Sequence, residues 1–208
     1  MKLVSLLERL EYTCLQGTTD QEVKNVIYDS RKVEEGSLFI CIRGAVVDGH
    51  KFVPDVVAKG AKVLVVEEAV EAPEDVTMIL VKDTRYAMAF ISAAYFGYPA
   101  EKLKTIGITG TKGKTTTTYM VKSILENAGY KVGLIGTIEA IIGDRKIPAK
   151  NTTPESYMVQ EYFHEMVEAG CDCVVMEVSS QGLMLHRTQG FIFDFGIFGL
   201  LYEHTQWI

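Results

Sequence analysis

The sequence predicts an α/β protein, and three observations support this fold class. Short apolar runs alternate with segments of helical periodicity along most of the 208 residues, as expected for strands and helices packed in layers. A glycine-rich turn at residues 110–113 joins one such run to a helical segment. Residues 97–100, Gly-Tyr-Pro-Ala, interrupt the alternation because proline and the residue before it resist helix formation. We therefore predict domains at residues 1–100 and 101–208.

The first predicted domain contains three short apolar runs typical of buried strands: residues 37–42, 62–66 and 77–81. Between the first two runs, Phe52, Val56 and Val57 fit the inner face of a short helix. Gly60 follows at the position where helices commonly end. A second helix is expected from about Thr84 to Phe96, so this domain should be a small α/β layer structure.

The second predicted domain begins with a strand and is expected to form a mainly parallel sheet. Its predicted strands are residues 104–109, 131–135, 173–178 and 191–198, with a hairpin at 138–147. Helices are expected at 114–128, where Val121, Ile124, Leu125 and Ala128 form one stripe, and at 155–169. Strands that alternate with helices in this way favour a parallel arrangement.

Composition and charge exclude several classes of protein. Apolar residues make up 48% and charged residues 23%, which argues against disorder. The formal net charge of −6 argues against a protein that mainly neutralises nucleic-acid phosphates. No apolar run reaches the roughly 18–20 residues that cross a bilayer. We therefore expect neither nucleic-acid nor membrane binding, and any anionic ligand must be bound by backbone amides, a few cations or a metal.

The four cysteines predict a reducing compartment. Cys14, Cys41, Cys171 and Cys173 form no C-x-x-C pair, so buried free thiols are favoured over a disulfide or a metal site. The expected location is the cytoplasm.

The strongest chemical feature is the glycine-rich turn between a predicted strand and a predicted helix. Its residues are Gly110, Thr111, Lys112, Gly113, Lys114, Thr115 and Thr116. Glycines allow backbone amides to surround phosphate oxygens, and Lys114 would supply a cation. The Thr115 hydroxyl is placed to bind Mg²⁺. The alternative is a structural turn with a surface lysine. Because the first glycine lies only three residues before Gly113, the turn is shorter than the common phosphate loop.

Glu177 ends a very apolar predicted strand. A carboxylate is costly to bury unless it is paired or binds a metal, and the carboxyl ends of parallel strands face the ligand crevice. Glu177 is therefore a second candidate Mg²⁺ ligand, with an exposed strand-end carboxylate as the alternative.

Three further segments are weaker signals. Asp29-Ser30-Arg31 is typical of a turn with a solvated arginine. The segment from Gly44 to His50 fits a strand-to-helix loop. Asn151-Thr152-Thr153-Pro154 fits the start of a helix, with Thr153 as cap.

Together these motifs resemble the Mur ligase family, and within it the members that form a tripeptide. The matching segments occur in family order: residues 29–31, 44–49, 110–116, 151–154 and 177–183, followed by Arg187. The resemblance implies an N-terminal domain for the uridine diphosphate end of the substrate and an ATP-binding central domain. It implies ATP and Mg²⁺ as cofactors. UDP-N-acetylmuramoyl-dipeptide and a diamino acid, either lysine or diaminopimelate, would be the substrates.

The resemblance also assigns roles to individual residues. Lys114 and Glu177 would be catalytic, with Thr115 and Glu177 at the metal. The implied substrate-binding residues are Ser30, Ala45, Val46, Val47, Asn151, Thr152, Thr153, Ser179 and Arg187. The implied reaction phosphorylates the terminal D-glutamate carboxylate, and the amino group of the diamino acid attacks the acyl phosphate.

The last residues depart from the family pattern, and His204 does not have the spacing of the family histidine. In relatives, a modified lysine, the adenine pocket and an amino-acid-binding domain lie beyond this point, so we expect a shortened form of a ligase. We also expect a monomer. Two alternatives remain open. One is a binding module without turnover, and the other is an unrelated phosphate-loop kinase or NTPase.

Overall fold

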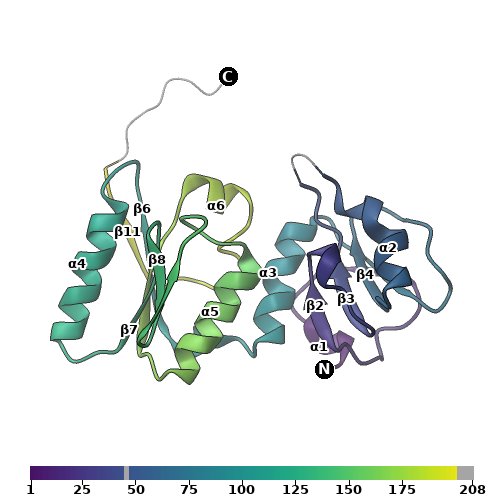
Figure 1. Cartoon of the computed structure of the whole chain (residues 1–208), viewed down its shortest axis with the longest axis horizontal. Coiled ribbons are helices and arrows are strands. Elements are labelled where there is room, and N and C mark those ends of the chain that lie inside the picture. The colour runs from purple at the N-terminus through teal and green to yellow at the C-terminus, as the bar shows by residue number, and fades with distance from the viewer. Residues whose placement is uncertain (45–46, 201–208) are drawn as a thin grey trace, which may run out of the picture. The chain divides into compact units, whose positions relative to one another are not determined.

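The computed structural model describes residues 1–44 and 47–200, and its internal contacts form two units that meet between Tyr95 and Phe96 (Figure 1). Each unit has its own sheet and its own helices. No helix in these described ranges is both long enough and apolar enough to cross a membrane.

The first unit contains a five-stranded sheet in the order β1-β5-β4-β3-β2. Its strands are β1 (Thr13–Gln16), β2 (Asn25–Ile27), β3 (Ser37–Ile40), β4 (Val63–Val66) and β5 (Thr77–Leu80). All neighbours are parallel except β1 and β5. The three predicted strands are confirmed. Strands β1 and β2 were not predicted, because β1 is not a continuous apolar run and β2 is only three residues long.

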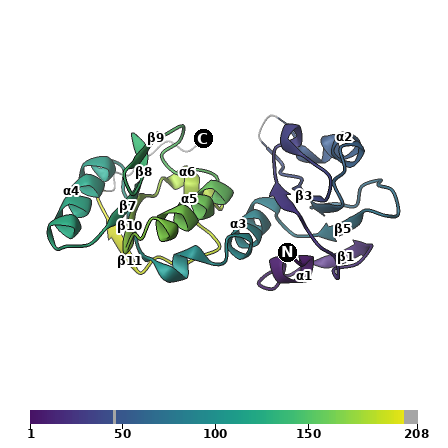
Figure 2. The same cartoon turned by 60° about the horizontal axis from the view of Figure 1, so that its bottom comes forward.

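Helices cover both faces of this sheet. They are α1 (Leu3–Leu6), α2 (Val53–Ala58) and α3 (Thr84–Tyr95), with short 3₁₀ turns η1 (Ser30–Lys32) and η2 (Gly49–Phe52). Helix α2 buries Val53 and Val56 against Leu64 and its neighbours. Helix α3 contacts α1 and β2, and Figures 1 and 2 show α2 and α3 on opposite faces. As predicted, α2 stops at Gly60, whose φ of +101° is a conformation that side chains rarely adopt.

The second unit contains a six-stranded sheet in the order β11-β6-β10-β7-β8-β9. Its strands are β6 (Lys104–Thr109), β7 (Val132–Ile135), β8 (Glu139–Ile142), β9 (Arg145–Pro148), β10 (Cys173–Glu177) and β11 (Phe195–Phe198). Strands β11, β6, β10 and β7 are parallel, and β8–β9 is an antiparallel hairpin. The predicted α/β class with mainly parallel sheets is confirmed.

The helices of this unit are η3 (Pro99–Lys102), α4 (Lys114–Asn127), α5 (Ser156–Glu168) and α6 (Ser180–Met184), of which η3 and α6 were not predicted. Helix α4 contacts one face of the sheet through Val121 and Leu125, while α5 buries Val159, Phe163 and Met166 in the other core. The stripe predicted for α4 is wrong in part. Ile124 is 65% exposed because α4 contacts the sheet along a narrower face, and Ala128 is exposed at the C-cap, just past the helix.

The cysteine prediction is also wrong at one position. Cys41, Cys171 and Cys173 are buried free thiols, but Cys14 is exposed on strand β1 at the edge of its sheet. Burial raises the pKa of Cys41 to about 12, so this thiol stays protonated at neutral pH.

Candidate functional site

The glycine-rich turn lies between β6 and α4 and has a backbone that requires glycine. Gly110 and Gly113 have φ values of +149° and +84°, which other residues rarely adopt. No side-chain hydrogen bond caps the N-terminus of α4, where the first amides of a helix have no intrahelical partner. The Lys114 ammonium donates to the Gly110 carbonyl at 2.8 Å and so lies across the turn. These features suit an anion site.

The segment that follows β11 runs along the same turn. The Gly199 amide donates to the Thr109 carbonyl at 2.7 Å, and the Thr111 amide donates to the Leu200 carbonyl at 2.8 Å. The Thr111 amide is therefore engaged within the protein, and a phosphate would have to be bound by amides nearer the helix. His204 lies outside the described residues.

Glu177 is fully buried and accepts three hydrogen bonds. The Thr115 hydroxyl donates to its Oε2 at 2.9 Å. The Thr137 amide donates to Oε1 at 2.9 Å, and the Thr137 hydroxyl donates to Oε2 at 3.0 Å. The sheet order explains this convergence, because β10 lies between β6 and β7 and ends with Glu177 beside the turns that follow both neighbours. We call Thr115, Thr137 and Glu177 the carboxylate corner.

Gly136 and Thr137 were not identified from the sequence. Thr137 belongs to this corner, and Gly136 packs against Glu177. A Cβ atom at Gly136 would lie 2.5 Å from the Glu177 Oε1 atom, so only glycine fits there without a shift. The available signal was positional: Gly136 and Thr137 directly follow a parallel strand, as the glycine-rich turn follows β6. The carboxyl ends of parallel strands share one edge.

The corner has oxygen atoms that suit Mg²⁺ as ligands. Hydroxyl and carboxylate oxygens are hard ligands, and octahedral coordination at about 2.0–2.1 Å places adjacent oxygens roughly 2.9 Å apart. The Thr115 Oγ1 and Glu177 Oε2 atoms are separated by 2.9 Å. No group of three or more His, Cys, Asp or Glu residues gathers in the described ranges. A metal at this corner would therefore need phosphate or water as its remaining ligands.

A second set of predicted residues contacts the backbone of Glu177 and of the segment that follows it. The Thr153 hydroxyl is buried, donates to the Glu177 carbonyl at 3.0 Å and accepts from the Ser179 amide at 3.0 Å. Arg187 donates to the Thr153 carbonyl at 3.0 Å and to the Glu155 carboxylate at 2.6 Å. The hydroxyl of Thr153 and most of the Arg187 guanidinium are thus used within the protein.

The predicted residues nearest to solvent on this side are Asn151 and Thr152. Asn151 is exposed and Thr152 is half-buried. The Thr152 hydroxyl lies 3.1 Å from that of Thr137, so the strand-end segments of β7 and β10 and the start of α5 meet at one edge. The Ser179 hydroxyl accepts from the Gly182 amide and caps α6.

The motifs of the first unit form a separate local structure. Ser30 lies in η1, where Asp29 accepts from the backbone amide of Arg31 and pairs with its guanidinium. The hydrogen bond from Arg31 lowers the pKa of Asp29 to about 2. Val47 is half exposed, whereas Ala45 and Val46 lie outside the described residues.

Two family models match the chain. One, described as the Mur ligase middle domain, matches residues 108–204, and the other, described as the Mur ligase family catalytic domain, matches residues 22–96. This chain belongs to the Mur ligase family.

Curated Mur ligases cover nearly all of this chain. It is 52% identical over 198 residues to the UDP-N-acetylmuramoyl-L-alanyl-D-glutamate--2,6-diaminopimelate ligase of Clostridium perfringens, covering 95% of this chain and 41% of that protein. The ligase of the same name from Clostridium tetani is 49% identical over 210 residues and is covered to 43%. The chain therefore spans about two fifths of the length of these relatives.

Solved Mur ligase structures share its fold. A crystal structure of MurF from Acinetobacter baumannii matches 86% of this chain and 36% of that one, with 27% identity and a TM-score of 0.60. A structure of a UDP-N-acetylmuramoyl-L-alanyl-D-glutamate--2,6-diaminopimelate ligase covers the whole chain and 42% of its own length, with a TM-score of 0.80. At 20% identity, the latter match shows the fold alone.

Proposed function

We propose that this chain is the front part of a cytoplasmic, ATP-dependent ligase that adds diaminopimelate to UDP-N-acetylmuramoyl-L-alanyl-D-glutamate. The names of relatives that are 49–52% identical supply the reaction and favour diaminopimelate over lysine. The carboxylate corner supplies the geometric support, because Glu177 contacts Thr115 of the phosphate loop directly. In this proposal a phosphoryl group passes to the D-glutamate carboxylate. The amine then attacks the acyl phosphate, phosphate leaves and an amide forms.

Each part of the loop has a distinct role in this proposal. The amides at the start of α4 bind phosphate oxygens, and the Lys114 ammonium exchanges the Gly110 carbonyl for a phosphate oxygen. Thr115 and Glu177 would bind Mg²⁺. The ion would neutralise charge that develops on the transferred phosphoryl group. Glu177 would be fixed for this role by Thr137 before the ligand binds.

We propose that Ser30 and the backbone of residues 45–47 bind the uridine diphosphate end. Asn151, Thr152 and Ser179 lie at the strand-end edge beside Glu177 and would contact the muramoyl part. Thr153 and Arg187 would act there mainly by positioning Ser179 and the start of α5, since their polar atoms are largely engaged.

Calorimetric titration with ATP, with and without Mg²⁺, tests this proposal. We expect Lys114→Ala to weaken ATP binding about 10–100-fold, because a hydrogen bond to a charged group contributes about 1.5–3 kcal/mol. Glu177→Gln should abolish the affinity gained with Mg²⁺. Arg187→Ala should change ATP affinity less than Lys114→Ala, because Arg187 contacts Thr153 and Glu155 rather than the loop.

Lys102→Ala is the matched control, since Lys102 is an exposed lysine of the same unit outside the loop. Equal losses for Lys114→Ala and Lys102→Ala would contradict the proposed phosphate site. A Glu177→Gln variant that keeps the full Mg²⁺ effect would contradict the proposed metal site.

A further inference from the structure

Helix α4 makes a second polar contact one turn after Thr115, with the first residue of β8. The Tyr119 hydroxyl donates to Glu139 Oε1 at 3.0 Å. Residues four apart lie on the same face of a helix, so Thr115 and Tyr119 point to the same side. Thr115 meets Glu177 at the end of β10, while Tyr119 meets Glu139 at the start of β8.

Glu139 also closes the turn that contains Thr137. The Gly136 amide donates to the Glu139 carbonyl at 3.1 Å, and the Ala149 amide donates to the Ile138 carbonyl at 3.0 Å. Thr137 lies within this turn and gives both its amide and its hydroxyl to Glu177. A displacement of Glu139 would therefore move the backbone that orients Thr137.

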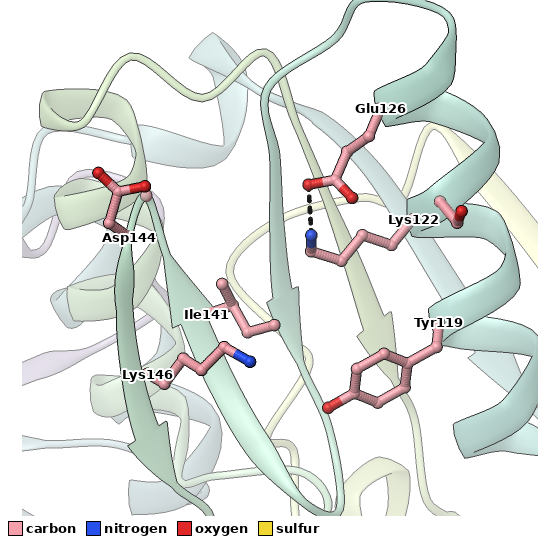
Figure 3. Close-up of a pocket in the computed structure, with 8 residues that line it drawn as sticks. Tyr119, Lys122, Glu126, Ile141, Asp144 and Lys146 are labelled. Carbon is pink, nitrogen blue, oxygen red and sulfur yellow. Dashed lines mark hydrogen bonds and ion pairs between the residues drawn. The ribbon is translucent and has the colours of Figure 1, made fainter.

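A third residue stabilises this contact from the hairpin. The Lys146 ammonium on β9 lies 3.4 Å from Glu139 Oε1. Figure 3 shows Tyr119 extending from α4 and Lys146 from the hairpin into the same cavity, which Ile141 also lines. Burial and the Glu139 carboxylate raise the pKa of Tyr119 to about 12, so its hydroxyl keeps the proton that it donates.

The cavity itself has a volume of about 370 Å³. Its second lysine, Lys122, is paired with Glu126 on the same helix. Because Lys122 and Lys146 are each paired with a carboxylate, the lining favours neither an anionic nor a cationic ligand. Of the polar groups that line it, Tyr119 joins α4 to the hairpin, through its hydrogen bond to Glu139.

We propose that Tyr119 and Glu139 are positioning residues of the carboxylate corner: they fix α4 against the β7–β8 turn so that Thr115 and Thr137 reach Glu177 together. This inference rests on the proposed function, since the corner acts by binding Mg²⁺ with ATP. In this proposal Tyr119 and Glu139 contact neither Mg²⁺ nor ATP. Their effect should appear in the contribution of the metal to binding and not in binding of the phosphates alone.

The test compares Tyr119→Phe with Tyr130→Phe, which alters an exposed tyrosine just beyond the same helix. The affinity gained by adding Mg²⁺ to ATP should fall about 3–10-fold in Tyr119→Phe, as expected for loss of one hydrogen bond. The affinity without Mg²⁺ should stay within about twofold of the wild type. Glu139→Ala should behave in the same way, whereas Glu139→Gln, which keeps an acceptor for Tyr119, should recover part of the loss.

Amide hydrogen exchange of ligand-free protein provides an independent readout. Exchange at the Thr137 amide should become several-fold faster in Tyr119→Phe and remain unchanged in Tyr130→Phe. Unchanged exchange would overturn the inference, as would equal losses of ATP affinity with and without Mg²⁺. A wild-type protein that gains no affinity from Mg²⁺ would overturn the proposed function instead, and the exchange result would still decide the role of Tyr119.

Discussion

Two carboxylates at predicted sites, Glu177 and Asp29, differ in how far along the chain their hydrogen-bond donors lie. Glu177 is fully buried and accepts its hydrogen bonds from Thr115 and Thr137, which lie 62 and 40 residues away in the chain. Asp29 accepts its hydrogen bonds from Arg31, two residues away, and the Arg31 side chain is 85% exposed. One carboxylate thus depends on the packing of three strands, whereas the other belongs to a local turn.

This difference separates a carboxylate that tertiary packing positions from one that its own turn positions. The position of Glu177 is determined before any ligand binds, because its partners come from β6–α4 and from the β7–β8 turn. The exposed Arg31 side chain is paired with Asp29 of its own turn, and exposed ion pairs contribute little to stability. Substitutions around Glu177 should therefore affect both folding and ligand binding, and those around Asp29 should act locally.

The largest effect is expected from Gly136→Ala. The added Cβ atom would lie 2.5 Å from Glu177 Oε1, and overpacking of this kind costs about 1–3 kcal/mol. Chemical denaturation should show this loss. Gly196→Ala is the control, because its Cβ atom would meet Phe198 at an ordinary 3.6 Å. Equal free energies of unfolding for the two variants would contradict this prediction, because they would show that the corner accommodates the added methyl group.

A smaller loss is expected from Thr115→Val, which removes one of the donors to the buried Glu177. Loss of such a hydrogen bond costs about 1–2 kcal/mol in the free energy of unfolding. Thr117→Val on the same helix is the control, since the contact of Thr117 with Gly113 is made by its backbone amide. If both variants unfold at the same denaturant concentration, the Thr115–Glu177 bond contributes nothing in the free protein.

The smallest effect is expected from Arg31→Ala. A folded-state pKa of about 2 for Asp29, below the ordinary 3.8, contributes stability above pH 3.8, which is lost as the pH falls through 2. Without Arg31, the pKa of Asp29 should rise towards 3.8 in an NMR titration. Because Arg31 is exposed, the stability lost at pH 7 should be below about 1 kcal/mol. Lys32→Ala should leave the pKa of Asp29 near 2, and an equal rise in that variant would contradict a specific role for Arg31.

The spacing of apolar residues and the positions of glycine and proline predicted much of the fold. Strand β6 and the beginning of α4 were predicted at their observed residues, because an apolar run, two glycines and an amphipathic segment follow one another there. Strand β2 was missed because it is only three residues long and alternates in burial. The exposed Ile124 was missed because spacing along a helix does not show how much of its face the sheet covers.

The glycine-rich turn and Glu177 were singled out from the sequence because each combines a strong local signal with the end of a strand. Thr137 has no local signal. Its role depends on β10 lying between β6 and β7, and strand order is a tertiary property. The same holds for Tyr119 and Glu139, whose contact joins residues 20 positions apart.

The most direct measurement uses Mn²⁺ with ATP as a paramagnetic probe of backbone amides in the wild-type protein. We predict strong broadening at Gly136, Thr137 and Glu177, which surround the proposed metal position. Gly170 and Cys171, which precede β10 at its other end, should remain sharp. Sharp signals from Gly136, Thr137 and Glu177 in the presence of bound Mn²⁺ and ATP would contradict a shared metal and phosphate site at this corner.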